Sequence, residues 1–219
     1  MTSIRNLFSD DDLARIQQAA RQAEGRTSGE IVAYLVARVD DYEEATWKGA
    51  ALGALALAAA GGFGNWLGEF WGVPAVLWMT LPAFLGAATG YLLARFSSTV
   101  ERWLISPGSL ERRVRLRAEA AFLEEEAFNT CERTGILIFV TLFEHRALIL
   151  ADSGIHQKVG EGAWNDLVQD LVEGIRAGRI TEALVEIIGR CGALLEEHGV
   201  ERRADDQNEL ADGLRLRER

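Results

Sequence analysis

Acidic residues stand at the ends of predicted strands. Glu30 opens an apolar run over residues 31–39, and Asp152 closes another over 147–151. A third run covers 136–142, and the short link Phe143-Glu144-His145-Arg146 that follows it predicts an antiparallel hairpin. If 31–39 runs parallel to 136–142, then Asp152 lies at the sheet edge where the other two strands begin. We therefore expect Glu30 and Asp152 to approach each other.

This juxtaposition predicts a divalent-cation site. Ser153 follows Asp152 directly, and Glu161 is placed to return to the same edge. Carboxylates, hydroxyls and turn carbonyls are the oxygen ligands that a hard cation takes, so Ca²⁺ is the expected cofactor if a cation binds. The alternative is ordinary turn chemistry at Asp152-Ser153-Gly154, with Glu30 as a solvated strand end. The residues alone leave both interpretations open.

Composition excludes several other functions. The chain contains no nucleophile elbow, metalloprotease helix, Walker loop or dinucleotide-binding loop. The two cysteines stand apart, so neither a zinc site nor a redox pair is indicated. The net charge is −10, which argues against nucleic acid as a partner because phosphate binding needs clustered Lys and Arg.

The middle of the chain has the pattern of a transmembrane hairpin. Residues 49–67 and 73–94 contain no charged side chain, and only a short link separates them. At 1.5 Å per residue the second run is about 33 Å long, roughly the thickness of bilayer hydrocarbon. Lys48 precedes the spans and six arginines follow them, so the positive-inside rule predicts a multi-pass cell (inner) membrane protein with both termini cytoplasmic. The alternative is a buried helical pair in a soluble core.

Small residues predict how the two spans pack. Ala54, Ala58 and Gly62 recur every four residues on the first span, and Gly86 and Gly90 form a GxxxG pattern on the second. Small side chains let helix backbones approach closely in lipid. We expect these five residues to form the contact within the hairpin or with a partner, so oligomers are compatible with the pattern.

The hairpin interrupts a domain. A strand apolar on both faces, such as 31–39, needs helices on both sides and partner strands from beyond the hairpin. We therefore expect an α/β/α sandwich with a small mixed sheet, built from residues 1–46 and 109–199 and interrupted by a transmembrane hairpin at 47–108. A long helix is predicted over 109–133, and residues 200–219 read as a flexible charged tail.

Both flanks resemble the TPM domain family. The resemblance rests on "FSDDDLARIQQAARQAEGRTSGEIVAYLV", "RTGILIFVTLFEHRALILADSGIHQKV", "WNDLVQDLVEGIRAGRITEALVEIIGRCG" and "NELADGLRL". It implies an α/β/α sandwich, calcium binding as reported for some members, and a weak acid phosphatase activity proposed for others. Many members keep the domain uninterrupted, whereas a hairpin is inserted here after Ala45.

Two functions follow as expectations. The first is a membrane-tethered interaction module that assembles or stabilises an unidentified membrane protein. The alternative is a weak metal-dependent acid phosphatase. The acidic character of the domain opposes attraction of anionic substrates, so the interaction module is favoured over an enzyme.

Overall fold

The chain folds into two compact units. The computed structural model describes residues 4–68, 74–200, 202, 210 and 213–218. One unit comprises residues 1–39 with 112–219, and the other comprises residues 40–111. The first unit is therefore assembled from both ends of the sequence, with the second inserted between them.

A four-stranded mixed sheet organises the first unit. Its order is β3-β2-β1-β4, where β1 is Glu30–Val36, β2 is Gly135–Thr141, β3 is Arg146–Ala151 and β4 is Arg215–Arg217. β1 runs parallel to β2 and to β4, and β3 runs antiparallel to β2. The predicted directions of the first three strands are confirmed. The first strand begins at Glu30 and ends at Val36, three residues before the end of the predicted 31–39, and the N–H groups of Leu142 and Phe143 donate to the carbonyls of Val36 and Ala37 at its end.

Strand β4 corrects the prediction of a wholly flexible tail over 200–219. Arg215 and Arg217 both pair with Glu125, at 2.6 Å and 3.5 Å. Leu214 and Leu216 pack against the main core. The segment alternates apolar and charged residues over only four positions, 214–217, and its order comes from these contacts with residues distant in sequence.

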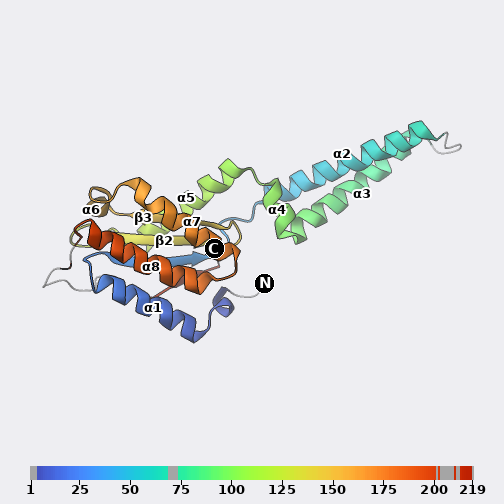
Figure 1. Cartoon of the computed structure of the whole chain (residues 1–219). Helices are drawn as coiled ribbons and strands as arrows, with labels where there is room; N and C mark the ends of the chain where they lie inside the picture. The colour runs from blue at the N-terminus through green and yellow to red at the C-terminus, as the bar shows by residue number, and fades with distance from the viewer. Residues whose placement is uncertain (1–3, 69–73, 201, 203–209, 211–212, 219) are drawn as a thin grey trace. The chain divides into compact units, whose positions relative to one another are not determined.

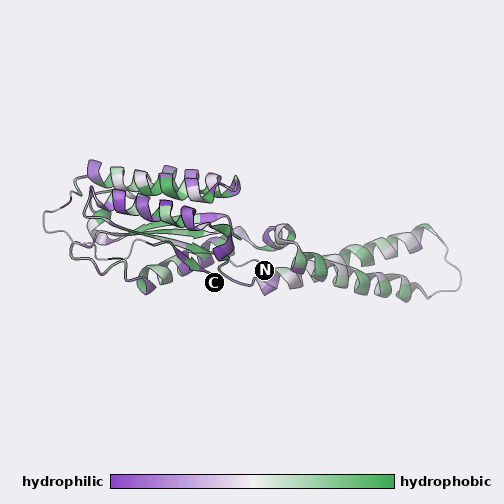
Figure 2. Ribbon diagram, turned by 90° about the horizontal axis from the view of Figure 1, so that it is seen from below, coloured by the Kyte–Doolittle hydropathy of each residue, from purple (hydrophilic) through white to green (hydrophobic). Residues whose placement is uncertain are grey.

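Helices lie on both faces of the sheet (Figures 1 and 2). Helices α1 (Asp10–Glu24), α7 (Asn165–Arg176) and α8 (Ile180–Glu197) share a core with Ile31, Ala33 and Leu35 of β1. On the opposite face, the Tyr34 hydroxyl accepts a hydrogen bond of 2.6 Å from Arg117 of α5 (Pro107–Glu124). The described part of this unit also contains three short elements: η1 (Ile4–Leu7), α6 (Ser153–His156) and η2 (Glu161–Trp164).

Helix α5 is shorter than the predicted helix over 109–133. It ends at Glu124, and the following chain turns at Glu126 and Arg133, whose φ angles are 51° and 57°. The turn brings the Ala127 carbonyl onto Gly135, where a Cβ would overlap it.

The second unit contains the apolar hairpin. Helices α2 (Glu43–Leu67) and α3 (Ala75–Phe96) pack along each other and are followed by α4 (Ser98–Leu104). Both long helices are mostly apolar (Figure 2), and they are long and apolar enough to cross a membrane. Their most apolar windows are only 0% and 6% buried within the protein, unlike the core helices of a soluble fold. The predicted link residues 69–72 lie outside the described residues.

Candidate functional site

Glu30 begins β1 as a buried residue. It is 4% exposed, which excludes the interpretation of a solvated strand end. Its backbone N–H donates to the Thr134 carbonyl at 3.1 Å, and its Oε2 accepts from the Leu210 N–H at 3.4 Å. The carboxylate therefore contacts the C-terminal segment that leads to β4.

Asp152 caps helix α6. Its Oδ1 accepts hydrogen bonds from the Ser153 N–H at 2.6 Å and the Ser153 hydroxyl at 3.2 Å. Its Oδ2 is buried, accepts no hydrogen bond from the described residues, and lies 3.6 Å from Nη1 of Arg133. The guanidinium already neutralises this carboxylate and would repel a cation placed against Oδ2.

The fold brings the backbones of Glu30 and Asp152 to the same sheet edge, with Gly135 between them. Glu30 pairs with Gly135, and the Asp152 N–H donates to the Gly135 carbonyl at 2.9 Å. Two strand spacings amount to about 10 Å. The space over Gly135 is occupied by the Ala127 carbonyl, since a Cβ there would overlap it. The two carboxylates therefore engage different partners across an occupied gap.

The other two predicted cation ligands are Ser153 and Glu161. Ser153 is exposed and bonded to Asp152, and Glu161 begins η2, with its side chain outside the described part of the structure. Among the described residues, no group of three or more His, Cys, Asp or Glu side chains is arranged to hold a metal ion. Calcium binding stays a prediction from the sequence.

Buried hydroxyls lie at this edge, and those of Thr130 and Thr134 were missed by the sequence reasoning. The Thr134 hydroxyl donates to the Ser28 carbonyl at 2.6 Å, and the Thr134 N–H donates to the Thr130 hydroxyl at 2.9 Å. The Thr27 hydroxyl accepts from the Gly29 N–H at 2.7 Å. These bonds satisfy backbone groups where β1 and β2 begin. The available signal was the concentration of Ser and Thr just before each strand.

An acidic groove lies between helices α7 and α8. It has a volume of about 240 Å³, and its lining includes Asp170, Glu173, Glu182, Glu186 and Arg179. Arg190 flanks it and pairs with Asp170 at 2.5 Å, a hydrogen bond that raises the pKa of the guanidinium above its usual range. The excess of carboxylates suits a cationic partner and repels phosphate.

The hairpin contact follows a glycine row. Gly53 faces Gly86, and Gly49 faces Gly90, so closely that a Cβ on Gly53, Gly86 or Gly90 would overlap the facing carbonyl oxygen. On α2 the closest row therefore contains Gly49, Gly53 and Gly61.

This row lies one position earlier than the predicted Ala54, Ala58 and Gly62. Those three residues are half-buried beside the seam, and the nearest side-chain atom to a Cβ on Gly62 would be 3.8 Å away. The glycines form the contact between α2 and α3 because a residue without a Cβ permits direct backbone contact.

Comparison with known proteins gives one structural likeness. Neither a protein-family model nor a curated protein matches the sequence. The fold resembles the NMR structure of BA42 protein from the psychrophilic bacteria Bizionia argentinensis, with a TM-score of 0.59, 18% identity and 99% of each chain covered. At this identity the likeness shows a shared fold alone.

Proposed function

We propose that this chain is a membrane-anchored interaction protein whose α/β/α domain, of TPM type, assembles or stabilises other membrane proteins. The observation that carries the proposal is the outward face of the hairpin. Leu55, Phe63, Leu81 and Phe84 are 68%, 60%, 62% and 76% exposed. Apolar surface of this extent, on helices without a charged side chain over residues 49–67 and 74–94, requires lipid or another membrane protein to cover it.

Strand pairing supports a domain on one side of the membrane. β1 precedes the hairpin and β2 follows it, yet the two strands are hydrogen-bonded neighbours. A chain that crosses twice returns to the side from which it started. Lys48 and Arg95 stand near the ends that join the domain, so the positive-inside rule supports a cytoplasmic position for it.

The acidic groove between α7 and α8 supports the choice of partner. Cytoplasmic loops of membrane proteins carry an excess of Lys and Arg. The groove is lined by four carboxylates and Arg179, and Arg190 and Arg15 pair with three of these carboxylates, so a net negative charge remains that complements such a loop. The net charge of −10 disfavours the phosphatase alternative, whose substrate is anionic.

The test is cross-linking of the full chain in its native membrane, with partners identified by mass spectrometry. A Glu173→Gln, Glu182→Gln double variant should lose cross-links to membrane proteins with basic cytoplasmic loops. A Glu196→Gln, Glu197→Gln control removes the same charge from exposed positions at the end of α8 and should keep these cross-links.

The proposal would be contradicted if the full chain formed the same cross-links as its hairpin fused to an unrelated domain. Phosphomonoester turnover that disappears in Asp152→Asn would favour the phosphatase instead.

A further inference from the structure

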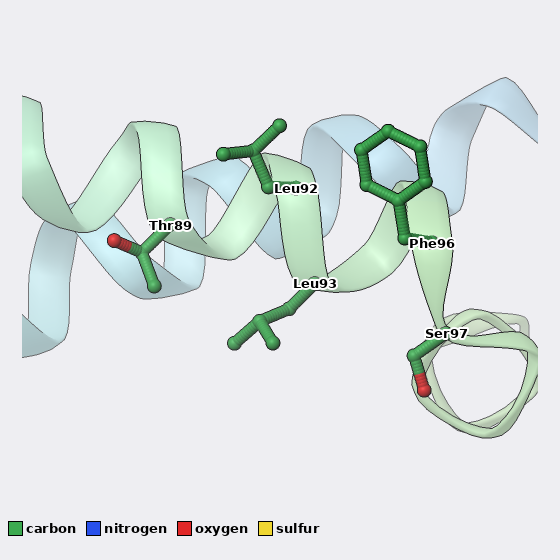
Figure 3. A pocket seen from close by; sticks show the side chains of 5 residues that line it. All are labelled: Thr89, Leu92, Leu93, Phe96 and Ser97. Carbon is green, nitrogen blue, oxygen red and sulfur yellow. The ribbon is translucent and has the colours of Figure 1, made fainter.

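An apolar groove lies on α3 near its C-terminal end. Thr89, Leu92, Leu93 and Phe96 follow the spacing of one helix face, and Ser97 closes the groove where the helix ends (Figure 3). The groove has a volume of about 350 Å³. The Thr89 hydroxyl donates to the Leu85 carbonyl of its own helix at 2.8 Å, so it presents its methyl group rather than a donor.

The apolar side chains that line this groove are exposed on the surface of the hairpin. Leu92, Leu93 and Phe96 are 51%, 54% and 82% exposed. The row of residues that contacts α2 runs through Gly86, Gly90 and Ala94, and the groove flanks this row, with Leu93 one turn from Gly90. The groove is therefore available to a ligand without disturbing the hairpin contact.

A cationic residue lies in the same helical turn as the end of the groove. Arg95 is exposed in the last turn of α3, one turn beyond Leu92. It makes no hydrogen bond or ion pair with any residue that the structure describes. Glu101, the carboxylate nearest to it in sequence, is only 8% exposed. An arginine at a helix end can lay its stem along apolar surface and present its guanidinium to a phosphate.

We propose that this groove binds an acyl chain of an anionic phospholipid, with the lipid phosphate paired to Arg95. The inference rests on the proposed membrane anchoring and adds the class of lipid. From Thr89 to Ser97 the groove extends about 12 Å along the helix, so an acyl chain lies along it with its head group at the Ser97 end. The Ser97 oxygen accepts from the Val100 N–H at 3.4 Å, and its O–H remains to donate to a phosphate or ester oxygen.

The experiment measures lipid retention by the full-length protein. The protein is reconstituted in nanodiscs of equal parts phosphatidylglycerol and phosphatidylcholine with the same acyl chains, released, and examined by native mass spectrometry. We expect phosphatidylglycerol to be retained with about fivefold preference, the effect of one basic residue at an anionic surface. Arg95→Gln should abolish the preference, whereas Arg112→Gln, the same charge loss at an exposed position in α5, should keep it. Leu93→Ala should lower retention more than Leu81→Ala, which lies outside the groove.

Several results would overturn the inference. Equal retention of both lipids, a preference that survives Arg95→Gln, or equal losses in the Arg95 and Arg112 variants would each do so. Disulfide cross-linking of two copies through Leu92→Cys in lipid would show a second hairpin as the occupant and would also overturn it. Alkaline carbonate extraction distinguishes failure of the membrane anchoring from failure of the lipid site. A chain that carbonate extracts from membranes contradicts the anchoring itself, whereas a resistant chain without lipid preference contradicts only this site.

Discussion

Gly53 and Gly86 meet backbone to backbone in the hairpin, and a Cβ on either residue would overlap the carbonyl oxygen of the other. Such an approach is possible only for glycine. In lipid, helix association depends on close packing and not on hydrophobic burial, so this contact is a main determinant of hairpin stability.

Enlarging the glycine contact should separate the helices. We expect Gly53→Leu to lower the thermal stability of the hairpin in detergent by the equivalent of about 1–3 kcal/mol, the usual cost of overpacking. Protease resistance and melting by circular dichroism would measure the loss. Gly64→Leu is the control, because a Cβ on Gly64 has no described atom within 4 Å. Equal stability of the two variants would show that the backbone contact does not hold the hairpin.

Gly135 should be similarly intolerant in the α/β domain. A Cβ at this position would overlap the Ala127 carbonyl, which lies between the Glu30 and Asp152 positions. Gly135→Ala should destabilise the domain by about 1–3 kcal/mol in denaturant unfolding. Gly160→Ala, where a Cβ meets nothing within 4 Å, should be close to neutral. A neutral Gly135→Ala would mean that the space over β2 is open, as a ligand site there would require.

The C-terminal strand should depend on Glu125. Its carboxylate pairs with both Arg215 and Arg217, and the Ala37 N–H donates to the Arg217 carbonyl at 3.0 Å. Glu125→Gln should therefore accelerate hydrogen exchange at the Ala37 amide. Glu119→Gln, which removes an exposed pair with Arg115, should leave that amide protected. Unchanged exchange in the Glu125 variant would show that the two ion pairs do not retain β4.

The two cysteines should differ in reactivity. Burial of Cys191 raises the pKa of its thiol to about 12, whereas Cys131 is exposed. Iodoacetamide at pH 8 should modify Cys131 alone in the native protein and both residues after unfolding, as peptide mass spectrometry would detect. Native modification of Cys191 at the rate of Cys131 would contradict a closed core.

The raised pKa of Cys191 also predicts a pH dependence of stability. The unfolded thiol ionises near its ordinary pKa of 9.0, whereas the folded thiol keeps its proton until about pH 12. The unfolded state therefore loses its proton first, and stability should fall as pH rises through this interval. Cys191→Ala should remove this contribution and Cys131→Ala should retain it, in denaturant titrations at a series of alkaline pH values.

Local sequence pattern predicted the elements that bury continuous apolar surface. The runs around Ile31, Ile136 and Ala147 gave three strands with their directions, and the charge-free segments gave the two long helices. A strand with only a short local signal was missed. Residues 214–217 alternate apolar and charged side chains over four positions, and the strand at Arg215–Arg217 is stabilised by Glu125 and the edge of β1, which lie far away in sequence.

The candidate site shows the same limit. The predicted strand directions correctly placed Glu30 and Asp152 at one edge. The sequence could not show which groups their carboxylates contact. The Arg133 guanidinium beside Asp152 and the Leu210 amide beside Glu30 come from turns outside the strands. The glycine row on α2 was missed by one position, because alanine and glycine rows are adjacent on a helix and only backbone proximity separates them.

The most direct test of the account is the membrane topology of the full chain. Single cysteines are placed at Asp11, Gly68 and Gln169 in a Cys131→Ser, Cys191→Ala background and labelled in intact cells with a membrane-impermeant maleimide. The account predicts a carbonate-resistant membrane protein in which the Gly68 position is labelled from outside, while the Asp11 and Gln169 positions react only after the membrane is opened. Labelling of either domain position in intact cells, or extraction of the chain by carbonate, would contradict a cytoplasmic domain anchored by a transmembrane hairpin.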